Sequence, residues 1–275
     1  MRLPIAIQFY TVRDEAEKDF FGTLQKIRDM GYEGVEFAGL FGHSPEEVRD
    51  RCREIGIIPV SAHVPLDDML ADPEGVARAY STIGCRFIAV PYVTEERRPG
   101  ADGFEKTVED IMDIGKVMNR YGLTLCYHNH DFEFVDIDGE YGLDVLYKKV
   151  PAELLQTELD VCWVSVGGAE PEDYILRYSG RAPLVHLKDY VKKGVDKPKK
   201  LYDLIGIDDG GETASEEDFS FMPVGHGVLD MPAIMKSGVQ AGAEWFIVEQ
   251  DRPEKGNTPM GAAKMSIEFL KQVNR

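Results

Sequence analysis

The sequence has little cysteine, and the four cysteines it has are isolated from one another. Cys52, Cys85, Cys126 and Cys162 form no C-x-x-C pair, which disfavours both a disulfide framework and a thiolate zinc site. We expect free, buried or half-buried thiols in a reducing compartment. Residues 1–4 show no signal-peptide pattern, and no apolar run is long enough to span a membrane. A cytoplasmic location without a membrane partner is therefore predicted.

Basic residues are also in short supply. The chain has 31 lysines and arginines against 49 aspartates and glutamates, which gives a formal net charge of −18. An acidic surface of this size repels the phosphate backbone of nucleic acids and anionic lipid. We therefore expect a small-molecule ligand and no nucleic-acid partner.

What the sequence does contain is a repeated joint between a helix and a strand. The 275 residues include five places where a helical pattern ends in glycine and an apolar strand follows within a few residues. Glycine accepts the left-handed conformation that closes a helix. Serial connections of this kind predict parallel strands. The five glycines are Gly31, Gly56, Gly84, Gly122 and Gly242.

Eight apolar segments alternate with helical patterns and show no domain break. They predict a single-domain (β/α)8 TIM barrel over residues 1–275, since an open doubly wound sheet would carry a Gly-rich phosphate loop after its first strand. Residues 190–223 form an insertion that is too long for a simple connecting loop, and we interpret it as a lid or an oligomer contact. The expected strands are Ile5–Phe9, Val35–Phe37, Ile57–Ala62, Phe87–Val90, Leu123–Tyr127, Leu154–Leu159, Leu184–Leu187 and Trp245–Val248.

The fifth expected strand ends in an unusual group of polar residues. Residues 122–134 read GLTLCYHNHDFEF, so an apolar strand leads directly into two imidazoles and two carboxylates. Such groups are costly to bury without partners, and a metal or a polar substrate would remove that cost. Active sites of TIM barrels lie at the C-terminal ends of the strands. Four of the six histidines fall at such ends, namely His63, His128, His130 and His186.

A metal site follows from the same positions. Glu133, Asp160, His186 and Glu249 stand at or just after the ends of neighbouring strands. Mixed carboxylate and imidazole ligation suits one divalent ion such as Mn, Mg, Co, Zn or Fe. We predict these four residues as its ligands.

Other strand-end residues are candidates for binding substrate or moving protons. Lys188 shares a strand face with His186, and it is interpreted either as a substrate clamp or base, or as the partner of an ion pair to Asp160 or Glu249. Glu133 and Glu249 are the other catalytic candidates. The predicted substrate-binding residues are Glu36, His63, His128, His130 and Trp163, the last as a wall against a sugar ring.

Taken together, these segments resemble the sugar phosphate isomerase/epimerase family of xylose isomerase-like TIM barrels. The resemblance extends over nearly the whole chain and includes residues 7–13, 34–37, 127–134, 159–163, 186–189, 224–227 and 248–251. It implies one divalent metal held by Glu, Asp, His and Glu. Asp160, His186 and Glu249 match the last three ligands, while the fifth strand offers His128 or His130 as the alternative to Glu133. Tagatose-type epimerases have a histidine where this chain has Trp163.

The resemblance implies proton removal next to a carbonyl group. The first hypothesis is a metal-dependent isomerase or epimerase acting on a sugar or keto-sugar through an enediolate. The alternative is a metal-dependent lyase or hydratase that carries out β-elimination on a 3-keto-sugar or inosose, with Lys188 or His130 as base. A third hypothesis is a non-catalytic sugar-binding subunit. An abasic-site nuclease of the same fold conflicts with the charge of −18.

Overall fold

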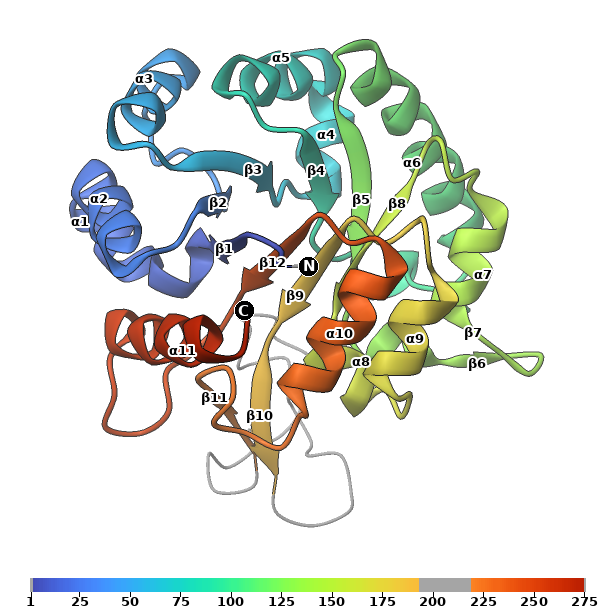
Figure 1. Ribbon diagram of the computed structural model, residues 1–275. Coiled ribbons are helices and arrows are strands. Elements are labelled where there is room, and N and C mark those ends of the chain that lie inside the picture. Colours follow the sequence, from blue (N-terminus) through green and yellow to red (C-terminus); the bar gives the residue numbers. More distant parts are fainter. Residues whose placement is uncertain (1, 193–218, 275) are drawn as a thin grey trace.

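The computed structural model describes residues 2–192 and 219–274. Eight parallel strands form one sheet in the order β3-β2-β1-β12-β9-β8-β5-β4, and helices surround this sheet on the outside (Figure 1). The prediction of an eight-stranded α/β TIM barrel is confirmed. The barrel strands are β1 (Ile5–Gln8), β2 (Gly34–Phe37), β3 (Ile58–Ala62), β4 (Phe87–Val90), β5 (Thr124–His128), β8 (Gln156–Asp160), β9 (Leu184–Leu187) and β12 (Trp245–Val248).

The barrel is nearly closed between β3 and β4. These two strands form no regular ladder, and they meet through an isolated parallel bridge between His63 and Ala89 and through backbone hydrogen bonds. The amide of Arg86 donates to the carbonyl of Val60, and the amide of Val64 donates to the carbonyl of Ala89. His63 therefore lies at the seam, just beyond the end of β3.

Local sequence signals mark several helix ends. Ser44 and Glu47 form a capping box at the start of one helix, and all five glycines at the predicted helix-to-strand joints have positive φ. The main helices are α1 (Arg13–Lys18), α2 (Phe20–Met30), α3 (Pro45–Ile55), α4 (Leu66–Ala71), α5 (Pro73–Ile83), α6 (Phe104–Arg120), α7 (Gly142–Lys149), α8 (Val161–Val166), α9 (Pro171–Arg177), α10 (Met231–Ala241) and α11 (Pro259–Val273). None of the helices in the described ranges is long and apolar enough to cross a membrane.

The interior of the barrel is layered. An apolar cluster fills its lower part, with Ala6, Phe87, Cys126, Leu184 and Ile247 among its members. Side chains on a strand alternate between the two faces, so the residue two positions further along points the same way. On β1, β5, β9 and β12 that residue is polar, and these side chains form a buried layer above the apolar one: Gln8, His128, His186 and Glu249. The four cysteines are all buried and unpaired, as predicted.

The two ends of the predicted insertion pair with each other. β10 (Asp189–Lys192) and β11 (Phe219–Met222) form an antiparallel ribbon that extends away from the barrel (Figure 1). The buried carboxylate of Asp189 holds its base, because it accepts hydrogen bonds from the backbone amides of Tyr190, Gly225, Gly227 and Leu229. The remainder of the insertion, 193–218, lies outside the described residues, and its interpretation as a lid or oligomer contact stays a prediction.

Candidate metal centre

A cavity opens at the C-terminal ends of the barrel strands. Its volume is about 450 Å³, which is within the range of small-molecule sites. Aromatic and aliphatic side chains line its upper part, including Tyr10 and Tyr92. Its polar lining consists of His63, His128, His130, Lys188, Glu249 and Asp251.

Four buried side chains in the floor of this region form a group that can hold a metal ion. One nitrogen or oxygen from each of His128, Asp160, His186 and Glu249 lies within 4.8 Å of the others. His128 Nε2 is 3.8 Å from Asp160 Oδ2 and 3.9 Å from Glu249 Oε2, and His186 Nδ1 is 3.3 Å from Glu249 Oε2. These residues come from β5, β8, β9 and the end of β12, which are consecutive in the sheet.

The backbone positions these ligands firmly. Asp160 pairs with His186 in the register of β8 and β9, and it is also the N-cap of α8, since its Oδ1 accepts a hydrogen bond from the amide of Trp163. The side chain of Asn129 accepts from the amide of Asp160 at 3.0 Å. Asp160 therefore presents its second oxygen, Oδ2, to the group while its first is held by the helix.

Two observations show that a divalent cation fits this set. Asp160 Oδ2 is buried and has no hydrogen-bond partner among the described residues, although an unpaired buried oxygen is costly. The donor set of two imidazoles and two carboxylates is also one that Mn, Fe, Co and Zn accept. His128 and His186 stand beside Asp160 and Glu249 as the residues that would hold the ion.

Burial and neighbouring charges set the ionisation of the carboxylates. Burial raises the pKa of Asp160 to about 7, although Lys188 partly opposes this. Burial would also raise the pKa of Glu249, but Lys188 and His186 outweigh it and hold that pKa well below its usual value. An ionised carboxylate and one that readily loses its proton are both suited to metal ligation.

Burial also favours the neutral form of two imidazoles, one at the end of β5 and one just after it. Burial lowers the pKa of His128 to about 3. It also lowers the pKa of His130 well below its ordinary value, with a further contribution from the neighbouring His128. His130 lines the cavity, and its Nδ1 has no hydrogen-bond partner within the described ranges. A neutral ring at this position has one nitrogen that can accept a hydrogen bond.

Lys188 is completely buried and forms the ion pairs that the sequence raised as one of its interpretations. Its Nζ contacts Asp251 Oδ2, lies 3.3 Å from Glu249 Oε2 and lies 3.7 Å from Asp160 Oδ2. Burial opposes its charge, but Asp251 and Glu249 outweigh that effect and hold the pKa of Lys188 well above its usual value. Lys188 is thus a protonated group at the cavity wall that can donate hydrogen bonds.

Glu133, which the sequence analysis predicts as a metal ligand, does not lie in the group of four. It follows β5 on the short 3-10 turn Phe132–Phe134, which carries its carboxylate away from the group of four. Its oxygens accept hydrogen bonds from Tyr127 Oη at 2.7 Å and from the amide of His130 at 2.8 Å. Neither potential ligand group among the described residues includes Glu133. The member from β5 is His128, one of the two alternatives.

Two predicted substrate-binding residues are not part of the cavity lining. Glu36 is fully buried below the floor, where it accepts from Gln8 Nε2 at 2.8 Å and contacts Ser61 Oγ. Trp163 is also fully buried, with its ring 5.8 Å from that of Phe221. Neither side chain lines the cavity in this structure. The other three predicted residues, His63, His128 and His130, do line the cavity.

Two residues of the site were missed by the sequence analysis. Glu158 lies two positions before Asp160 on β8, and its Oε1 is 2.5 Å from His63 Nε2. Asp251 follows β12 and contacts Lys188. The strand period of two could have identified both residues. It places Glu158 on the same face as Asp160, and it places Asp251 on the same side as Glu249.

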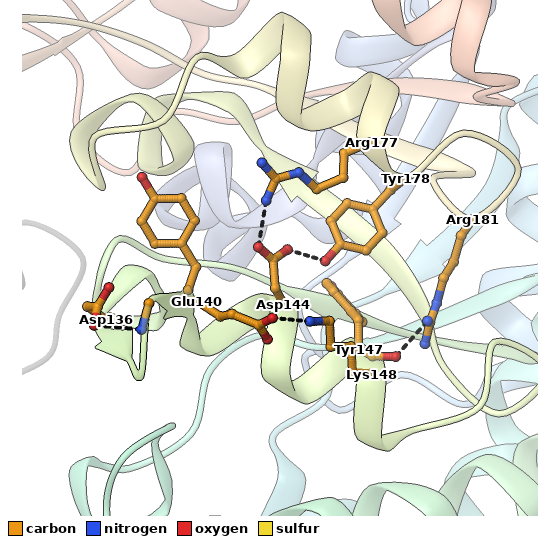
Figure 2. Close-up of a pocket in the computed structure, with 10 residues that line it drawn as sticks. Asp136, Glu140, Asp144, Tyr147, Lys148, Arg177, Tyr178 and Arg181 are labelled. Carbon is orange, nitrogen blue, oxygen red and sulfur yellow. Dashed lines mark hydrogen bonds and ion pairs between the residues drawn. The ribbon is translucent and has the colours of Figure 1, made fainter.

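A larger cavity, of about 620 Å³, lies outside the barrel mouth and is shown in Figure 2. Its charged side chains are already paired with one another: Arg177 with Asp144 at 2.6 Å, and Lys148 with Glu140. Arg181 donates to three backbone carbonyls. No described atom of its lining is buried without a partner, so it lacks the unmet polar groups of the barrel mouth.

Comparison with known proteins gives the family. Residues 24–273 match the sequence profile of the xylose isomerase-like TIM barrel family. The chain belongs to this family. This agrees with the resemblance drawn from the sequence motifs and with the eight-stranded barrel.

Relatives and solved structures are similar over most of the chain. The inosose dehydratase of Geobacillus kaustophilus (strain HTA426) is 23% identical over 273 residues, which cover 91% of this chain and 86% of that protein. Matches to inosose dehydratases of Bacillus cereus and Bacillus thuringiensis span just over half of those proteins, 56% of each.

The solved structures share the fold. A sugar phosphate isomerase/epimerase from Parabacteroides distasonis ATCC 8503 superposes with a TM-score of 0.78 at 17% identity, covering 98% of this chain and 94% of that one. The IolI protein, whose crystal structure holds a zinc atom, superposes with a TM-score of 0.70 at 16% identity, covering 100% and 98%.

Proposed function

We propose that this protein is a divalent-metal-dependent enzyme that removes a proton next to the carbonyl group of a polyhydroxylated ketone and eliminates water from it. The observation that carries the proposal is that a neutral imidazole, His130, and a protonated ammonium, Lys188, line the same cavity beside the ligand group. An elimination needs one proton acceptor and one proton donor of this kind.

The proposed ligands are His128, Asp160, His186 and Glu249. A divalent ion bound there supplies a Lewis acid for the carbonyl and hydroxyl oxygens of the substrate. Two of these ligands are carboxylates, and the Oδ2 atom of Asp160 has no hydrogen-bond partner within the described ranges, which supports this assignment. The zinc atom in the IolI structure, which has the same fold, gives it further support.

The chain's own residues account for the proton transfers. The imidazole of His130 takes the proton from the carbon beside the carbonyl. The bond between the β-carbon and its hydroxyl oxygen breaks, and Lys188 Nζ gives that oxygen its proton, so that water leaves and a carbon–carbon double bond forms. Asp251, in contact with Lys188, stabilises the ammonium form that this step requires, and proton exchange with solvent restores both groups.

The substrate class follows from the cavity and from the sequence relatives. The cavity offers several hydrogen-bonding groups and a volume of about 450 Å³, which suits a keto-sugar or a keto-cyclitol. The inosose dehydratase of Geobacillus kaustophilus matches over 86% of its length, and its name describes such a reaction.

Isomerisation or epimerisation of a keto-sugar is the second candidate. It uses the same proton removal and returns the proton to the other face or to the neighbouring carbon. The observation in its favour is His63, a second imidazole that lines the cavity on a different strand end from His130. The fold shared with a sugar phosphate isomerase/epimerase agrees with either candidate.

The two candidates are separated by a panel of ketoses and inososes incubated with the protein and Mn²⁺ in deuterated water. Elimination produces an ultraviolet enone signal and a product lighter by one water. Isomerisation or epimerisation produces a sugar of unchanged formula that carries solvent deuterium. Absence of both, in protein shown to contain metal, would contradict the proposed enzyme and favour a sugar-binding subunit.

A further inference from the structure

A second buried layer lies directly below the proposed ligands, and one carboxylate oxygen is at its centre. Glu158 Oε1 is 2.5 Å from His63 Nε2, 3.1 Å from His186 Nε2 and 3.2 Å from His128 Nδ1. Glu158 is fully buried. Because an ionised carboxylate only accepts hydrogen bonds, His63 Nε2 and His128 Nδ1, which hydrogen-bond to it, act as donors.

This arrangement divides the two nitrogens of His128 between two neighbours. Nδ1 faces Glu158 in the lower layer, while Nε2 faces Asp160 and Glu249 in the ligand group. A proton held on Nδ1 by Glu158 leaves the lone pair of Nε2 free for an ion. Which nitrogen of a neutral imidazole binds a metal is set by the hydrogen bond that the other nitrogen makes.

The two nitrogens of His186 also face the two layers, but with Nδ1 and Nε2 exchanged relative to His128. Its Nε2 faces Glu36 at 2.8 Å as well as Glu158, and its Nδ1 faces Glu249 at 3.3 Å. His186 therefore has two carboxylates below it, whereas His128 has only Glu158 among the described residues. Loss of Glu158 would leave His128 without its partner but would leave His186 with Glu36.

We propose that Glu158 is the positioning residue of the metal centre, and that the His128–Glu158 pair takes the place of a carboxylate ligand on the fifth barrel strand. Metal-bound histidines usually donate their second N–H to a carboxylate, which orients the ring and makes it a better ligand. The negative charge that a glutamate ligand would supply is carried here by Glu158, one layer below His128. The inference rests on the proposed metal centre.

The competing explanation is that a second ion occupies the lower layer. His63, His128, Glu158 and His186 offer four donor atoms within 4.8 Å of one another, and Glu158 Oε2 has no partner in the described part of the chain. However, His128 and His186 belong to both groups. To ligate two ions at once, each ring would have to give up both of its N–H protons, whereas a single ion leaves each ring one N–H that faces Glu158 or Glu36.

The test uses Glu158→Gln in the full-length chain, with Glu158→Met as a second variant that removes the acceptor as well as the charge. Glu36→Gln is the matched control, because Glu36 pairs with His186 but forms no hydrogen bond or ion pair with His128. Mn²⁺ affinity is measured by competition with a chelating fluorophore, and stoichiometry by elemental analysis. Nitrogen-15 NMR of metal-free protein reports which nitrogen of His128 carries the proton, and circular dichroism checks the fold.

We expect one ion per chain, and Mn²⁺ affinity lowered about 10- to 100-fold by Glu158→Gln. His128 should change from a single Nδ1–H form to a mixture in the Glu158 variants, while the control keeps the single form. In a His128→Glu background, where a carboxylate ligand is restored directly, Glu158→Gln should have a distinctly smaller effect on affinity.

Unchanged affinity together with an unchanged His128 tautomer would overturn the inference. So would two ions per chain in the unaltered protein with one lost in Glu158→Gln, because the lower layer would then be a metal site. Failure of the metal centre itself is recognised separately: Mn²⁺ binding would be absent or would survive Asp160→Asn. The tautomer of His128 in metal-free protein still tests its pairing with Glu158 in that case.

Discussion

Asp160 serves two purposes with its two oxygens. Oδ1 caps helix α8 by accepting from the amide of Trp163, while Oδ2 faces the ligand group with no hydrogen-bond partner among the described residues. The two roles can be separated experimentally, because asparagine keeps an acceptor oxygen for the cap and loses the charge that a divalent ion requires.

We predict that Asp160→Asn lowers metal affinity by more than about 100-fold, the upper range for outer-sphere partners, and abolishes turnover. The unfolding temperature of the metal-free protein should change little, since the N-cap is retained. Calorimetric titration with Mn²⁺ and thermal unfolding in chelator measure the two effects. Full activity in the variant would remove Asp160 from the ligand set.

Lys188 contributes through its charge at the cavity. Methionine has a similar length and cannot donate a proton, so Lys188→Met should lower kcat by about 100-fold or more, as expected for loss of a general acid. The substitution also removes the ammonium group that pairs with Asp251 and Glu249, which destabilises the metal-free protein.

The matched comparison is Lys192→Met, at the exposed end of β10. It removes a lysine from the same region of the chain without touching the carboxylates at the barrel mouth. Steady-state kinetics and urea unfolding of both variants give the comparison. Equal activity of Lys188→Met and Lys192→Met would show that Lys188 has no role in proton transfer.

At the scale of elements, the junction between the barrel and the β10–β11 ribbon depends on Asp189. Its carboxylate satisfies four backbone amides, and a Cβ at Gly227 would approach its Oδ1 to 2.1 Å. The segment HLKD, which in the sequence looks like one functional motif, therefore contains two kinds of residue. His186 and Lys188 face the site, whereas Asp189 fastens the loop that follows.

We predict that Asp189→Ala destabilises the protein by about 1–3 kcal/mol, because it leaves one buried and three partly buried backbone amides without an acceptor. The midpoint of urea unfolding measures this, and hydrogen exchange at residues 225–229 should rise at the same time. Metal affinity per folded molecule should stay close to that of the unaltered protein. A selective loss of metal binding with unchanged stability would contradict the structural role.

At the scale of the whole molecule, the barrel mouth concentrates negative charge. Five buried carboxylates surround it, namely Glu36, Glu158, Asp160, Glu249 and Asp251, while Lys188 is the one fully buried lysine or arginine in the described ranges. Burying like charges together is unfavourable unless a cation compensates them. The folded barrel should therefore gain stability from an ion that the unfolded chain binds only weakly.

We predict that removing metal with a chelator lowers the thermal midpoint by several degrees, and that Mn²⁺ restores it. At a free ion concentration 100 times the dissociation constant, the expected gain is about 2.7 kcal/mol. Scanning calorimetry in chelator, and then with added Mn²⁺ or Mg²⁺, measures it. Asp160→Asn serves as the control, because its midpoint should not respond. Identical midpoints for the unaltered protein in both conditions would argue against the metal centre.

Much of the architecture could be predicted from local patterns. The expected strands Phe87–Val90, Leu184–Leu187 and Trp245–Val248 agree with β4, β9 and β12. Parallel strands place their C-terminal ends at one mouth of a barrel, so His186 and Glu249 could be assigned to one site before any contact was known. These conclusions depend only on periodicity and on glycine at helix ends, which are local properties of the chain.

The amino-acid sequence by itself therefore determined the fold class and the kinds of side chain that gather at the barrel mouth. Only the tertiary structure decided which of them meet. The turn after β5 directs Glu133 to Tyr127 and leaves His128 in the ligand group, and neighbouring strands bring Glu158 beneath it. The physical reason is that strand period fixes the face on which a side chain lies, whereas contacts across the barrel depend on turn conformation and on the stagger between strands.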